Sequence, residues 1–134
     1  MSGPRTTLAP GADAIERIAR DVLAKLPEEF ADQLGNVVIG IQDFADDATL
    51  DALGLDDPFQ LSGVYQGRPL TERSSFDTAT LPDMIRLFRR PLLDEWAESG
   101  ETLEAIVGHV LIHEIGHHFG LSDADMHALE QAAD

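Results

Sequence analysis

Residues 101–120, "ETLEAIVGHVLIHEIGHHFG", form the most apolar stretch of this 134-residue chain. Their apolar side chains recur at helical spacing and cover nearly the whole circumference of the helix that they predict. These apolar positions are Leu103, Ile106, Val107, Val110, Leu111, Ile112 and Ile115. A helix that is apolar on all sides is normally buried, so we predict a buried helix over residues 101–119.

One polar stripe interrupts this helix. Its members follow one another at spacings of three and four residues: His109, His113, Gly116, His117 and Gly120. Side chains four residues apart on a helix have Cβ atoms about 5–6 Å from each other. The imidazoles of His113 and His117 are therefore close enough to bind one metal ion, at Zn–N distances of about 2.0–2.1 Å. Gly116 keeps the floor of the expected cleft low.

Two acidic residues complete the expected metal site. Glu114 lies about one helical step from His113, so its carboxylate can lean over the ion as the general base for a metal-activated water. Gly120 supplies a left-handed turn that redirects the chain, and Asp123 follows as an oxygen donor. Two histidines, one carboxylate and an open fourth position are typical of catalytic Zn²⁺, although Mn, Fe or Co accept the same ligands.

The stretch "HEIGHHFGLSD", residues 113–123, matches the pattern HExxHxxGxxD. It resembles the signature of zincin metallopeptidases whose third zinc ligand is an aspartate, and especially the small bacterial minimal-zincin domains. The resemblance implies that His113, His117 and Asp123 bind zinc. It also implies that Glu114 is the catalytic base of an enzyme that hydrolyses peptide bonds.

Two further stretches are similar to this family: "GVYQGRPLTERS" at residues 63–74 and "LPDMIRLFRRPLLDEW" at residues 81–96. The fold that the resemblance implies is α+β, a zincin-like minimal metalloprotease fold with helices packed on a small mixed β-sheet. We expect a flexible leader over residues 1–12 and one zincin-like domain over residues 13–134.

The site residues also have structural interpretations. HExxH alone occurs by chance in helices whose histidines are otherwise satisfied. Glu114 can pair with His118, four residues along on the same flank. Asp123 can cap the last helix, or Ser122 can do so in a capping box with Asp125, which leaves Asp123 to bind the metal.

Other polar residues of this region have weaker functional interpretations. Three imidazoles spread over eight residues do not easily converge on one ion, so we expect His109 to pack or to support a ligand. His127 is expected at the surface. Tyr65 can donate to a developing oxyanion, but packing in the core or on an edge strand is the simpler interpretation.

A second hypothesis is a non-catalytic or weakly active module that keeps the zincin scaffold and binds metal or peptide. Metzincins have a methionine-containing turn beneath the metal, but only eleven residues follow Asp123 here, and they look helical. Met126 is the one methionine among them and is expected to be a helix packing residue.

The rest of the chain predicts an alternation of helices and strands. Residues 13–26 read as a helix with a capping box formed by Asp13 and Glu16. Further helices are expected at residues 30–34, 46–54 and 91–99, the last with Pro91 at its first position. Alternating apolar residues predict strands at 36–44, 61–66 and 83–89, and a turn at residues 66 and 67 allows another strand after it.

The composition limits the classes of function. The chain has no cysteine, which excludes disulfides, thiolate zinc sites and cysteine nucleophiles. Its 25 acidic and 9 basic residues give a net charge of −16, which opposes binding to nucleic acid or an anionic membrane. Because no apolar run resembles a signal peptide or a membrane span, we expect a cytoplasmic protein. The resemblance to zincins implies that its partner is a peptide or protein substrate.

Overall fold

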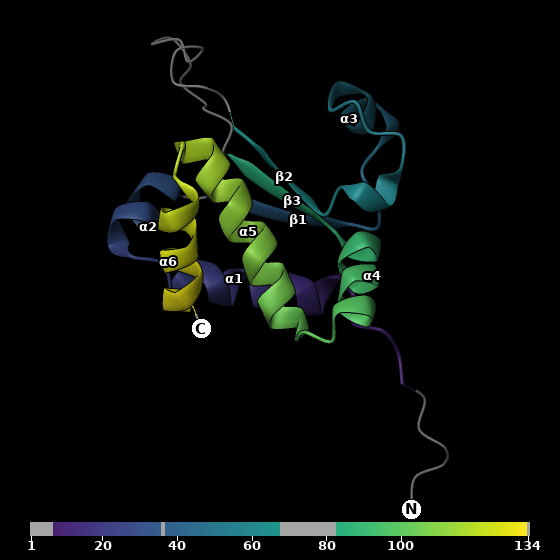
Figure 1. Cartoon of the computed structure of the whole chain (residues 1–134), viewed down its shortest axis with the longest axis horizontal. Coiled ribbons are helices and arrows are strands. Elements are labelled where there is room, and N and C mark those ends of the chain that lie inside the picture. The colour runs from purple at the N-terminus through teal and green to yellow at the C-terminus, as the bar shows by residue number, and fades with distance from the viewer. Residues whose placement is uncertain (1–6, 36, 68–82, 134) are drawn as a thin grey trace, which may run out of the picture.

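The protein is described from a computed structural model, which places residues 7–35, 37–67 and 83–133. The additional strand expected after residues 66 and 67 lies outside the described residues, as does the first half of the expected leader. Within the described ranges, six α-helices pack on one three-stranded mixed sheet (Figure 1). The predicted α+β fold is therefore confirmed.

The helices and strands follow one another in this order: α1 (Ala12–Ala24), α2 (Glu28–Leu34), β1 (Val38–Gln42), α3 (Asp47–Ala52), the 3-10 helix η1 (Pro58–Gln60), β2 (Gly63–Gln66), β3 (Met84–Phe88), α4 (Arg89–Ser99), α5 (Leu103–Phe119) and α6 (Asp123–Ala133).

Strand β3 is the centre of the sheet. It pairs in parallel with β1 and antiparallel with β2, so that Ile85 lies opposite both Ile39 and Tyr65. The predicted alternation in β3 is confirmed, because Ile85 and Leu87 are fully buried in the main core. Phe88 points to the other face and is buried in a second, smaller apolar cluster.

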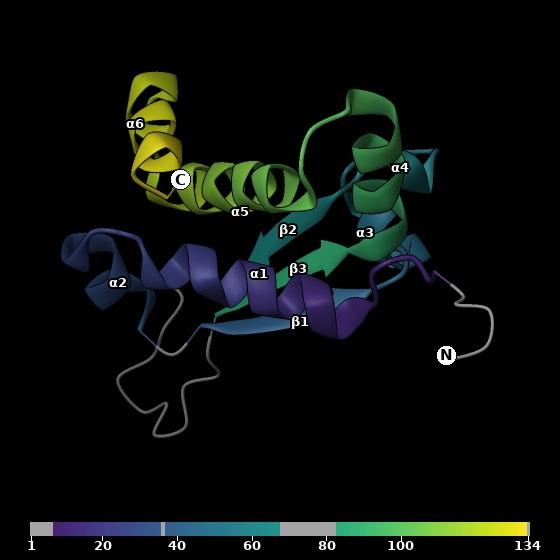
Figure 2. The same cartoon turned by 90° about the horizontal axis from the view of Figure 1, so that it is seen from below.

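Helices α1 and α5 contact each other and cover one face of the sheet, α1 over β1 and α5 over β2 and β3 (Figure 2). Helices α4 and α6 pack on α5 toward its two ends. The predicted burial of α5 is confirmed at six of its seven apolar positions, and Val110 is partly buried. No helix in the described ranges is both long and apolar enough to cross a membrane.

Both ends of α5 are fixed by local hydrogen bonds. The Thr102 hydroxyl accepts a bond from the backbone N–H of Ala105 at 3.1 Å and caps the first turn. Gly120 has the left-handed conformation, with φ of 68°, and the N–H of Leu121 donates to the carbonyl of Gly116 at 2.8 Å. The helix that carries the motif therefore has a defined start, end and exit direction.

Two predicted helix starts are wrong. Helix α1 begins at Ala12 after Gly11 and has no side-chain cap, and Glu16 pairs with Arg20 at 3.6 Å instead of forming a capping box. Helix α4 begins at Arg89, so Pro91 is its third residue. A proline is accommodated there because the first four N–H groups of a helix have no partner within it.

Candidate metal and catalytic site

Helix α5 presents polar side chains to two different neighbours. The β2 flank consists of Glu114 and His118 together with Tyr65 of β2 and Asp83, just before β3. The α6 flank consists of His109 and His113 together with Glu130 of α6. His117 lies between these flanks, because each residue of a helix advances by about 100°.

Glu114 connects the motif helix to the edge of the sheet. Its Oε2 accepts the backbone N–H of Tyr65 at 3.3 Å. Burial raises the pKa of the Glu114 carboxyl above its ordinary value, while the Tyr65 N–H and the charge of His117 oppose that change. The raised pKa makes this carboxylate a stronger base than an ordinary glutamate.

The other residues of the β2 flank hold one another. The Tyr65 hydroxyl donates to Asp83 Oδ2 at 2.8 Å, and its ring stacks on His118 with centroids 4.0 Å apart. His118 Nε2 lies 3.9 Å from the same Asp83 oxygen, so His118 faces Asp83. The predicted packing of Tyr65 at the sheet edge is confirmed, since the ring packs against the main core.

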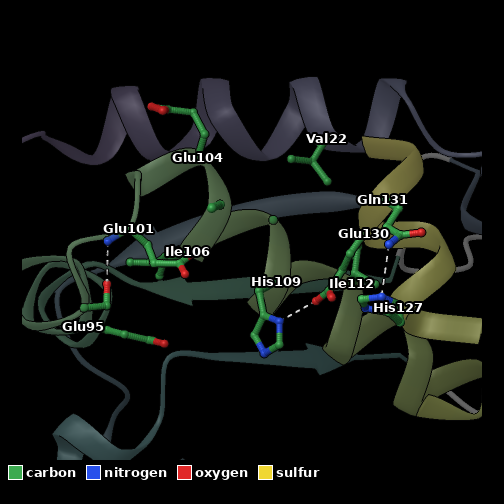
Figure 3. A pocket seen from close by; sticks show the side chains of 13 residues that line it. Val22, Glu95, Glu101, Glu104, Ile106, His109, Ile112, His127, Glu130 and Gln131 are labelled. Carbon is green, nitrogen blue, oxygen red and sulfur yellow. Dashed lines mark hydrogen bonds and ion pairs between the residues drawn. The ribbon is translucent and has the colours of Figure 1, made fainter. Parts of the chain in front are cut away.

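The α6 flank brings the imidazoles of His109 and His113 to the carboxylate of Glu130, and Figure 3 shows the contact between His109 and Glu130. His109 Nδ1 is in contact with Glu130 Oε1, and His113 Nε2 lies 3.7 Å from the same oxygen. The two rings have centroids 4.1 Å apart, and one donor atom from each of the three residues lies within 4.8 Å of the others. This His/His/Glu group could bind a metal ion.

The predicted ligands are not gathered in the same way. The rings of His113 and His117 are perpendicular, with centroids 6.1 Å apart, and Asp123 is an exposed residue in the first turn of α6. Among the described residues, the group within 4.8 Å contains His113 but neither His117 nor Asp123. The assignment of His113, His117 and Asp123 as zinc ligands therefore stays a prediction.

The start of α6 matches one of the arrangements expected for Asp123. The Ser122 hydroxyl accepts the N–H of Asp125 at 3.1 Å, and the Asp125 carboxylate accepts the N–H of Ser122 at 3.4 Å. This is the predicted capping box. Because Ser122 and Asp125 form the cap, capping does not require the carboxylate of Asp123.

The sequence analysis did not identify Glu130, and it did not count His109 among the metal ligands. Met126 and Leu129 are both buried, so they mark the face of α6 that packs on α5. Glu130 comes four residues after Met126 and therefore lies along the same face. The helical pattern of α6 was a signal for this position, but nothing local indicated which residue of α5 it would meet.

Gly116 has a different role from the one expected. It is buried under Met126, and a Cβ placed on it would lie 2.2 Å from the Met126 sulfur. Gly116 therefore lets α6 approach α5 and does not line an open cleft. The prediction that Met126 packs between helices is confirmed, because its side chain is buried against this glycine.

Residues 34–133 match the family described as zincin-like metallopeptidase. The chain belongs to the zincin-like metallopeptidase family. The match runs from the end of α2 through α6 and so includes both flanks of α5. No curated protein matches the chain.

Membership in the zincin-like family indicates a hydrolase with a divalent metal ion, typically zinc. The residues present fit such an ion by their chemistry, because α5 offers neighbouring imidazoles with a half-buried carboxyl beside them. The fixed ends of α5 hold these groups on one rigid element.

Proposed function

We propose that this protein is a zinc-dependent metallopeptidase in which His113, His117 and Asp123 hold the ion and Glu114 is the general base. The observation that supports this most directly is the position of Glu114. Its carboxylate lies between the motif helix and the edge of β2 that faces α5, half-buried and with a raised pKa. If a peptide lies along this strand, the Glu114 carboxylate is next to it and can act as the base for its hydrolysis.

A zinc ion, when bound, would polarise the scissile carbonyl and make water more acidic. Glu114 then takes a proton from the attacking water and delivers it to the nitrogen of the leaving amine. Its raised pKa favours the first step, because a carboxylate with a higher pKa is a stronger base.

The sheet topology narrows the choice of substrate strand. Of the two strands that the sequence predicts at residues 61–66 and 83–89, the second is β3, which is paired on both sides and has no open edge. In the described part of the sheet, β2 has β3 as its one neighbour and faces α5 with its other edge. We therefore place an extended peptide along β2, where it would be recognised by main-chain hydrogen bonds.

A metal- or peptide-binding module without effective turnover is the second candidate. The observation that favours it is the exposed position of Asp123, outside the group that contains His113. In that case the scaffold would bind a divalent ion and an extended peptide, and Glu114 would have only a structural role at the sheet edge.

The two candidates are separated by a peptide-library cleavage assay on zinc-loaded protein. For the enzyme, Glu114→Gln lowers kcat by about 10²- to 10⁴-fold, because general-base catalysis contributes that much. Glu104→Gln is the matched control, since it removes an exposed carboxylate in the first turn of the same helix. Activity that survives Glu114→Gln removes Glu114 as base, and equal inactivity of wild type and both variants favours the binding module.

A further inference from the structure

We propose that His109, His113 and Glu130 form a second site for a divalent transition metal, alternative to the motif site because both require His113. Two imidazoles and one carboxylate are ligands that zinc, cobalt and nickel accept. That the two sites exclude each other rests on the proposed function, which places His113 in the motif site. The existence of the second site does not depend on the proposed function.

The geometry of the α6 flank is close to that of a metal site. An ion with bonds of about 2.0–2.1 Å in a tetrahedral arrangement separates its ligand atoms by about 3.3 Å. The His113 nitrogen and the Glu130 oxygen are 3.7 Å apart, and all three donor atoms lie within 4.8 Å of one another. Small rotations of three side chains therefore suffice to bind an ion.

The carboxylate of Glu130 gives an independent reason for a cation here. Its Oε1 is buried and, among the described residues, forms no hydrogen bond of good geometry, although two imidazole nitrogens face it. A buried carboxylate oxygen without such bonds is costly. A divalent ion between this oxygen and the two imidazoles would offset that cost.

A pocket of about 500 Å³ gives solvent ions access to His109 and Glu130, two of the three residues (Figure 3). Its described lining includes Glu95, Glu101 and Glu104 in addition to His109 and Glu130, and it contains no lysine or arginine. A cleft lined by one sign of charge raises the local concentration of the opposite ion. The pocket therefore favours cations around His109.

The second site avoids the geometric difficulty that argues against His109 as a ligand of the motif site. It does not need three imidazoles from one straight helix, because its third ligand comes from α6, a different element. His113 is a ligand in both the motif site and the second site, and one imidazole cannot bind an ion in both sites at once. Each chain therefore binds one ion, in one site or the other.

The test measures zinc binding by equilibrium dialysis and elemental analysis. His117→Ala removes a motif ligand but leaves the second site complete, so this variant still binds one zinc ion per chain, as does the wild type. Adding Glu130→Gln to His117→Ala weakens zinc affinity by at least about tenfold, because it removes a ligand. Adding Glu104→Gln instead lowers affinity much less than Glu130→Gln does, because Glu104 lines the same pocket but is not a ligand.

Three results would overturn the proposal. These are a His117→Ala protein that binds no zinc, an affinity that Glu130→Gln does not change, and two tightly bound ions in the wild type. Imidazole NMR on His117→Ala protein provides a measurement that needs no further variant. Zinc shifts the His109 resonances and leaves those of His127, which lines the same pocket, in place. Shifts at His127 without shifts at His109 would also contradict the site.

The outcome of the peptidase assay is independent of this zinc-binding measurement. If the wild type cleaves no peptide but Glu130 controls zinc binding in His117→Ala protein, the proposed function is wrong and the second site stands. If Glu114→Gln abolishes cleavage while His117→Ala protein binds no zinc, the proposed function stands and the second site is wrong.

Discussion

The two flanks of α5 use the same kind of residue for different purposes. On the β2 flank, the Glu114 carboxylate accepts a backbone N–H at the edge of a strand, where we propose that a peptide lies. On the α6 flank, the Glu130 carboxylate meets two imidazoles, where a cation can lie. The partner element, and not the type of acid, decides what each carboxylate can do.

The largest expected effect comes from His113, the residue that both sites require. His113→Ala removes a ligand of either proposed site. Mutations of residues that only support a metal ligand weaken affinity by about 10- to 100-fold, so we expect a larger loss of zinc affinity here. His118→Ala is the control, because it removes a histidine of the β2 flank, where the ring faces Asp83. Zinc titration of both variants measures the difference, and wild-type affinity in His113→Ala protein would contradict both sites.

The α6 flank depends on the packing of Met126, which is 3% exposed. Met126→Ala leaves a cavity between α5 and α6 and lowers the free energy of unfolding by about 2–5 kcal/mol. Chemical denaturation measures the loss. Leu53→Ala is the control, because that leucine is 50% exposed and its truncation costs much less. Equal losses in the two variants would mean that Met126 does not hold α6 in place.

Gly116→Ala approaches the same contact from the other helix. The new methyl group collides with Met126, which costs about 1–3 kcal/mol of stability after the chain adjusts. Gly108→Ala is the matched control on α5, since its Cβ would lie 3.6 Å from a Val22 methyl, an ordinary contact. Alanine there is neutral or stabilising by up to about 1 kcal/mol. Thermal unfolding in which Gly116→Ala behaves like Gly108→Ala would show that α6 lies elsewhere.

The smallest expected effect tests the β2 flank. Tyr65→Phe keeps the ring on His118 but removes the hydroxyl that donates to Asp83, so stability falls by about 1 kcal/mol. Zinc affinity of the α6 flank stays unchanged in the same variant, because Tyr65 contacts Glu114 and His118, on a different side of α5 from His109 and His113. A change in zinc affinity would show that the flanks are coupled through α5.

Much of the fold could be predicted because its signals are local. The alternation around Ile85 and Leu87 identified the central strand, and the continuous apolar pattern identified α5 as a buried helix. The cap at Ser122 and the turn at Gly120 also follow from nearby residues. The prediction of a capping box at Asp13 was wrong, because the N-cap of α1 is Gly11. Residue spacing alone does not distinguish Gly11 from Asp13 as the cap.

By itself, the sequence determined the helical spacing of His109, His113 and His117, the position of Glu114 beside them, and the place where α5 ends. Those features depend on helical periodicity and on hydrogen bonds between residues close in the chain. Only the tertiary structure decided that Glu114 faces β2, that Glu130 reaches His113 and that Met126 covers Gly116. These contacts join separate elements, and their geometry is set by how the helices pack on one another and on the sheet.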